Sequence, residues 1–165
     1  MIKASVSMQD FLRTGEFGPV HLGISRRQLR DHLGEPEDWG PAPKAKHHAG
    51  IWKYGDIEFH FGGEALCLIF ADHVEKLHGG RAIDLDTWIL DGGALVGQVL
   101  EGLAAAYLPY QRIPWALDDA TERFLVGAGV ELLFLDETQH MFCDEGVSPH
   151  AQPGMTFGGF SYSGR

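Results

Sequence analysis

Nine histidines make imidazole the functional group most available for chemistry in this 165-residue chain. Imidazole binds zinc and exchanges protons near neutral pH. A zinc site needs three or four converging ligands, commonly at short fixed spacings, and the chain has neither a His-x-x-x-His nor a Cys-x-x-Cys motif. We therefore predict no metal and no other cofactor, and a small metal-dependent or small-molecule-processing enzyme is the alternative function. That enzyme would use a histidine-rich rim made of His47, His48, His60, His73 and His78.

Nucleophilic catalysis would need a serine or cysteine on a strained turn with a base in reach. The chain has no Gly-x-Ser-x-Gly motif, and Cys67 and Cys143 both fall in strand-like segments, where reduced and buried thiols are expected. Four acidic pairs could suggest glycosidase chemistry, but most lie at predicted turns, where acidic residues are common for conformational reasons. We predict no catalytic residue and favour a binding function. The pairs are Asp84/Asp86, Asp118/Asp119, Asp136/Glu137 and Asp144/Glu145.

The pattern of residues 51–70 predicts a three-stranded antiparallel meander. This meander is the element that would hold any functional side chains in place. In its middle strand, apolar residues at 57, 59 and 61 alternate with Glu58 and His60, so those two polar side chains share one face. Gly62-Gly63 provides a tight hairpin turn. Residues 65–70 follow as an unbroken apolar run, which predicts a strand covered on both sides.

The rest of the chain predicts further helices and strands. Ser25 and Gln28 form a capping box at the start of a helix that ends at Gly34, and a short helix begins near Ser7. A third helix is predicted over residues 94–107 from its apolar stripe. Strands are predicted at 121–126, 130–135, 139–143 and 157–162, and residues 35–50 and 71–81 are predicted to be loops.

The two halves of the chain show a short internal similarity. The pattern of residues 57–61 returns 73 positions later at 130–134, and the order helix, proline-containing loop, meander also returns. Chance similarity between two amphipathic hairpins explains the match equally well. We predict an α+β fold with an antiparallel sheet built from two helix-then-meander units and helices on one face. Residues 1–165 would form one domain, and if the internal similarity reflects a repeat, residues 1–80 and 81–165 would be its related halves.

The formal net charge of −10 bears most directly on partners. Such a surface repels phosphate backbones, so we predict no nucleic-acid binding. The chain has no apolar run of membrane-spanning length and no signal-peptide core near its start, so we expect no membrane association and a cytoplasmic location. The charge could serve solubility alone, or it could attract a basic protein partner.

Three motifs carry a resemblance to known bacterial proteins: Leu22-Gly23-Ile24-Ser25, Leu33-Gly34-Glu35-Pro36 and Trp52-Lys53-Tyr54-Gly55. This half of the chain resembles small helix-then-sheet domains of the β-barrel assembly lipoprotein family and of the tandem-repeat β-lactamase inhibitor proteins. It also resembles the short acidic immunity proteins that neutralise bacterial toxins. The lipoprotein signal and the inhibitors' paired cysteines are missing, so no functional residue is transferred.

We therefore predict a non-enzymatic cytosolic binding protein, of the type of an immunity inhibitor, which holds a basic protein against an acidic face of the sheet. Tryptophan and tyrosine are common at binding hot spots, although packing in the core would explain them as well. A homodimer through exposed strand edges is a further possibility. The predicted binding residues are Trp52, Tyr54, Glu58 and His60, with Asp136 and Glu137 from the second half.

Overall fold

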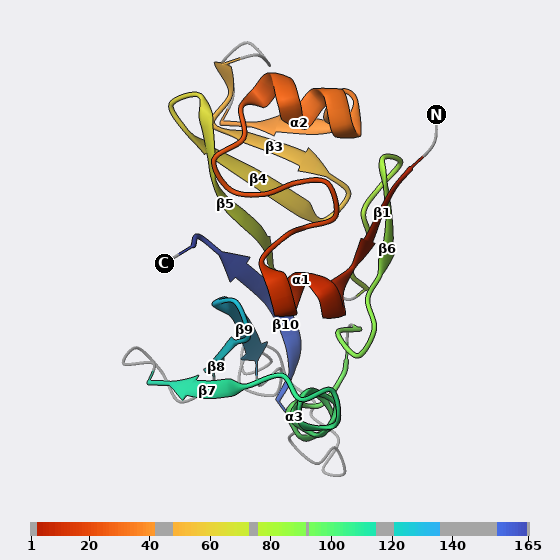
Figure 1. Cartoon of the computed structure of the whole chain (residues 1–165), viewed down its shortest axis with the longest axis vertical. Helices are drawn as coiled ribbons and strands as arrows, with labels where there is room; N and C mark the ends of the chain where they lie inside the picture. The colour runs from red at the N-terminus through yellow and green to blue at the C-terminus, as the bar shows by residue number, and fades with distance from the viewer. Residues whose placement is uncertain are drawn as a thin grey trace, which may run out of the picture.

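The computed structural model describes residues 3–41, 48–72, 76–91, 93–114, 121–135 and 155–164. Within them the chain is an α+β protein with an eight-stranded antiparallel sheet, a two-stranded parallel sheet and three helices (Figure 1). The large sheet has the order β2-β3-β4-β5-β10-β9-β8-β7. Its strands are β2 (Asp38–Gly40), β3 (Ile51–Tyr54), β4 (Ile57–Gly62), β5 (Ala65–Asp72), β7 (Tyr110–Ile113), β8 (Thr121–Val126), β9 (Val130–Leu135) and β10 (Thr156–Tyr162).

The small sheet was not predicted. It pairs β1 (Ala4–Ser7) with β6 (Ile83–Asp86) in parallel, joining the start of the chain to its middle. The four residues of β1 directly precede the first helix, and so short a strand gives no alternating pattern of its own. The predicted strand at 139–143 lies outside the described residues.

The three helices are α1 (Met8–Thr14), α2 (Arg26–Leu33) and α3 (Val96–Ala105). The predicted capping box of α2 is confirmed, since the Ser25 hydroxyl accepts from the Gln28 backbone N–H and the Gln28 side chain accepts from the Ser25 N–H. Helix α3 is shorter than the predicted 94–107. It ends at Ala105, with Ala106 as its C-cap, and the left-handed residue Tyr107, with φ 55°, follows. No described helix is long and apolar enough to cross a membrane.

The predicted meander is confirmed as β3, β4 and β5, but the prediction that β5 is covered on both sides is wrong. Ala65 and Cys67 are exposed, whereas Leu66 and Ile69 are buried. A bulge opposite His60 and Phe61 inserts one extra residue in β5, so Cys67 faces solvent instead of the core. The apolar run therefore has one buried face and one that is only partly covered.

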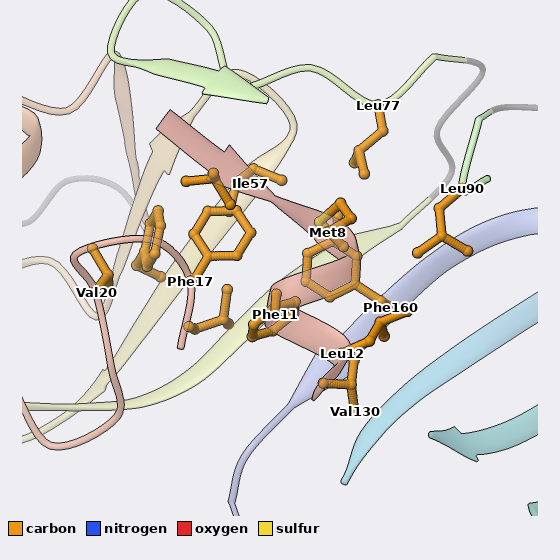
Figure 2. Close-up of a cluster of buried hydrophobic side chains, with 14 of the residues drawn as sticks. Met8, Phe11, Leu12, Phe17, Val20, Ile57, Leu77, Leu90, Val130 and Phe160 are labelled. Carbon is orange, nitrogen blue, oxygen red and sulfur yellow. The ribbon is translucent and has the colours of Figure 1, made fainter. Parts of the chain in front are cut away.

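The core lies on one face of the large sheet, where α1 packs across the join between β5 and β10. Phe11 of α1 makes edge-to-face contacts with Phe17, Phe160 and Tyr162 at centroid distances of 5.1, 5.6 and 5.5 Å. Figure 2 shows Phe11 and Phe17 gathered with Phe160 of β10. Buried residues of all three helices belong to this single apolar cluster, together with buried residues of the large sheet.

Candidate functional site: the outer face of the sheet

We call the face of the large sheet opposite the core the outer face. Directly paired residues on neighbouring strands share a face, so the strand registers define its members. Glu58 pairs with both Lys53 and Phe70, and Ser161 pairs with both Phe70 and Glu131, which traces one row across β3, β4, β5, β10 and β9. All of these side chains are partly exposed, in contrast to the buried residues between them.

Trp52 and Tyr54 do not lie on this face, so their predicted placement beside Glu58 and His60 is wrong. Trp52 pairs with Phe59 and Tyr54 with Ile57, which directs both aromatic side chains into the core at 1% and 0% exposure. The Tyr54 hydroxyl donates to the Gly34 carbonyl at 2.7 Å, and burial raises its pKa. Asp136 and Glu137, the predicted contribution of the second half, lie outside the described residues.

Glu58 and His60 do lie on the outer face, in a group that we call the Lys53 cluster. Lys53 Nζ is 2.8 Å from Glu58 Oε1, and His60 Nε2 is 2.8 Å from Glu58 Oε2. The carboxylates of Asp38 and Asp72 also act on Lys53 electrostatically. The cluster, made of Asp38, Lys53, Glu58, His60 and Asp72, therefore holds three carboxylates around a single lysine.

The ionisation of this cluster follows from its contacts. Burial alone would raise the pKa of Glu58, but the hydrogen bonds from Lys53 and His60 outweigh burial, and the pKa is lowered from its usual 4.5. The hydrogen bond to Glu58 raises the pKa of Lys53 above 10.5, against a smaller opposite effect of burial. Both groups are therefore charged at neutral pH, and the ion pair between them persists there.

We expect Glu58→Gln to lower the free energy of unfolding by about 1 kcal/mol at about pH 7. Since the folded-state pKa of Glu58 lies below the unfolded value, its contribution is present above that value and is lost as the pH falls through the folded pKa. Urea unfolding should therefore show the wild type and the variant converging when it is repeated in acid, well below pH 4.5. The exposed pair Arg27–Asp31 gives a control, Asp31→Asn, with a change under about 0.5 kcal/mol at either pH. An unchanged difference between the two pH values would contradict this account of Glu58.

A hollow of about 280 Å³ lies beside the cluster, over β5, β10, β9 and β8. Its apolar lining comes from Phe70, Leu133 and Leu135, all half-buried. Strand β10 crosses the hollow with Ser161, a small residue that pairs with Phe70 and with Glu131 of its neighbours, so no large side chain of β10 fills the space between them.

The polar lining of the hollow includes an ion pair between Arg123 and Glu131, together with Thr121 and Ser161. Arg123 and Glu131 come from adjacent strands of the second half, and both side chains are largely buried. The hollow therefore combines an apolar floor with a charged rim. Such a surface suits a bound molecule that places an apolar group on the floor and a polar group at the rim.

The comparisons with known proteins do not assign this chain: no family model, no curated protein and no solved structure matches it. The outer face is therefore interpreted from its own geometry.

The histidines of the alternative enzyme do not converge within the described part of the chain. His60 of β4 contacts Glu58. His78 lies in the loop after β5 and contacts a different carboxylate, Asp56, at 3.4 Å. No three His, Cys, Asp or Glu side chains of the described residues come together as a metal site would require. His47 and His73 lie outside those residues.

The sequence interpretation missed the residues that line the hollow. The apolar run 65–70 predicts a strand covered on both sides, which hides Phe70, and residues 130–135 predict a strand without indicating which face carries Leu133 and Leu135. The alternation of burial along β9 places Val130, Leu132 and Phe134 in the core, which leaves the leucines between them on the outer face. Leu133 shares that face with Glu131, so the glutamate was the signal of an accessible side of this strand.

Proposed function

We propose that this chain is a protein-binding module, of the type of an immunity inhibitor, that binds a basic protein through the outer face of its sheet. One observation carries the proposal. A hollow with an apolar floor lies next to a carboxylate-rich cluster, on the face of the sheet opposite the buried core. Interfaces commonly join an apolar centre to a polar rim in this way.

The charge of the outer face favours a basic partner. Asp38, Glu58, Asp72 and Glu131 bring four carboxylates to the described strands of this face. Lys53 and Arg123 are the lysine and arginine found there. With a formal net charge of −10 on the whole chain, a basic protein would be attracted over a distance as well as at contact.

The size of the hollow favours a protein side chain over a cofactor. Pockets for small organic ligands typically enclose about 300–1,000 Å³, whereas this one encloses about 280 Å³ and opens on a broad face. One apolar side chain of the partner would fill it and contact Phe70 and Leu133. The partner's lysine or arginine residues would then lie beside Asp38 and Asp72.

The internal similarity is part of the same proposal. Helix α2 precedes β2–β5 and helix α3 precedes β7–β10, and the two sets meet at the β5–β10 pair. This order favours two related helix-then-meander units. The Lys53 cluster would then come from the first unit, and most of the hollow from the second.

We expect Phe70→Ala and Leu133→Ala each to weaken binding of the basic partner about tenfold or more, because each removes part of the apolar floor. A secreted basic protein encoded beside this gene is the first candidate partner, and biolayer interferometry measures its rate constants. The control is Arg27→Ala, which changes an 85% exposed side chain on helix α2, away from the outer face. The association rate should also fall as ionic strength rises.

Two results would count against the proposal. An association rate that is the same at low and high salt would remove the electrostatic argument. A rise of several degrees in melting temperature with a divalent metal would instead favour the alternative enzyme, because ligands that bind only the folded state stabilise it.

A further inference from the structure

Strand β7 ends the large sheet, and we propose that it pairs antiparallel with β7 of a second copy to form a symmetric homodimer. In the described part of the chain β7 has one neighbour, β8. Its four residues, Tyr-Gln-Arg-Ile, include no proline, lysine or bulge, three of the features that protect an edge strand from pairing. Prolines flank both edge strands, at Pro109 and Pro114 beside β7 and at Pro41 beside β2, and β2 is the poorer template because it has only three residues.

The backbone groups that β7 presents outward can be identified from its pairing with β8. The Gly127 N–H donates to the Pro109 carbonyl at 2.9 Å, and hydrogen-bonded pairs alternate along an antiparallel ladder. Gln111 and Ile113 therefore direct their backbone groups toward β8. The N–H and C=O groups of Tyr110 and Arg112 point away from the sheet, and no backbone hydrogen bond to them is found among the described residues.

One register satisfies all four of these groups. With Gln111 on the two-fold axis, Tyr110 lies opposite Arg112 of the second copy, and the two residues exchange both backbone hydrogen bonds. Symmetry repeats this pair, so four hydrogen bonds form.

The two neighbouring registers are worse. An axis at Tyr110 places Arg112 opposite Leu108, whose N–H already donates to the Leu103 carbonyl at 2.9 Å. An axis at Arg112 places two arginines directly opposite and sets Tyr110 against Pro114, which has no N–H to donate. The register centred on Gln111 is therefore the one that this edge favours.

The side chains agree with that register. Tyr110 is 43% exposed, and the Arg112 side chain is 68% exposed with its guanidinium 3.0 Å from Glu122. Each arginine would meet the tyrosine ring of the other copy, a favourable cation–π contact, and no like charges would be paired. Glu122 would keep the arginine charge balanced as the interface excludes water.

Tyr107 supports a contact surface at this end of the molecule. Its backbone is left-handed at φ 55°, a conformation that favours glycine, yet its side chain is 91% exposed. Trp88 has a similar φ of 53°, but its side chain packs against the core. Tyr107 lacks such compensation among the described contacts, and exposed tyrosines of this kind commonly anchor interfaces.

The test compares two substitutions at one position by sedimentation equilibrium of the whole chain. Tyr110→Lys places a like charge opposite Arg112 of the second copy, whereas Tyr110→Glu places an opposite charge there. We expect the wild type to dimerise, and the lysine variant to dissociate about tenfold more readily than the glutamate variant. Thermal unfolding followed by circular dichroism checks that both variants stay folded.

Arg112→Pro gives a second test. The Arg112 N–H points away from β8, so proline removes no ladder bond within one copy but removes one from each pair in the dimer. The expected result is a folded monomer. A wild type that is monomeric at every concentration, equal dissociation constants for the two Tyr110 variants, or a dimer that survives Arg112→Pro would each overturn the proposal. None of these results depends on the partner of the outer face.

Discussion

Trp52→Ala is expected to lower the free energy of unfolding by about 3–5 kcal/mol, the usual cost of removing a large aromatic side chain from a core. Trp52 is 1% exposed, and its ring lies 5.2 Å from that of Phe61 in an edge-on contact. Alanine would leave a cavity between β3 and the residues packed on it, and the loss would come mainly from missing contacts. Urea unfolding followed by circular dichroism, at an unchanged m-value, measures it.

The matched substitution is Phe70→Ala, on the other face of the same sheet. Phe70 is half-buried at the hollow, so its removal should cost only about 1 kcal/mol of stability. The two variants thus separate stability from binding: Trp52→Ala would lose partner binding only through unfolding, and Phe70→Ala would lose it while folded. A stability loss for Trp52→Ala no larger than that for Phe70→Ala would place the indole outside the core.

Trp52 shows which side-chain positions a local sequence pattern predicts and which it does not. Residues 57–61 alternate strongly, and β4 follows that alternation, with Ile57 and Phe59 buried and Glu58 and His60 partly exposed. The aromatic residues of β3 were assigned to the exposed face by residue type alone. The two-residue turn at Gly55-Asp56 pairs Tyr54 with Ile57, so both must share a face, and applying this pairing to the sequence would have corrected the assignment.

The edge strands were harder to predict for a different reason. Strand β2 lies in a segment predicted to be a loop, and β7 lies between the predicted helix 94–107 and the predicted strand 121–126, because each has only three or four residues next to prolines. So short a segment carries no periodic signal, and its strand geometry comes from pairing with β3 or β8. The capping box of α2, in contrast, depends on two residues three positions apart and was predicted correctly.

The hollow could not be derived from the sequence, because it depends on strands that are distant along the chain. Phe70 in β5 and Leu133 in β9 meet only because β10 returns between them. The small residue Ser161 of β10, which pairs with Phe70 and with Glu131, then leaves space that a larger residue would have filled. Only the strand order makes these positions neighbours.

Arg26→Met is expected to lower the free energy of unfolding by about 2–3 kcal/mol, although methionine keeps most of the side-chain volume. The Arg26 side chain is 10% exposed at the start of α2. Its guanidinium donates to the Gly63 carbonyl in the β4–β5 turn and to the Ala49 carbonyl at 3.1 Å, and it stacks 4.3 Å from the centre of the Phe61 ring. Methionine would leave both carbonyls without these donors and would detach the helix from the turn.

Two controls show which of these contacts matters for stability. Arg27 neighbours Arg26 but is 85% exposed, and within the described residues its ion pair is with Asp31, so Arg27→Met should change the free energy of unfolding by less than about 0.5 kcal/mol. Glu64→Gln removes the carboxylate 3.3 Å from Arg26, and since Glu64 is 81% exposed, we expect an equally small effect. A loss for Glu64→Gln as large as that for Arg26→Met would place the stabilisation in the ion pair. With both controls near zero, it lies in the donation to the backbone carbonyls that joins α2 to the hairpin.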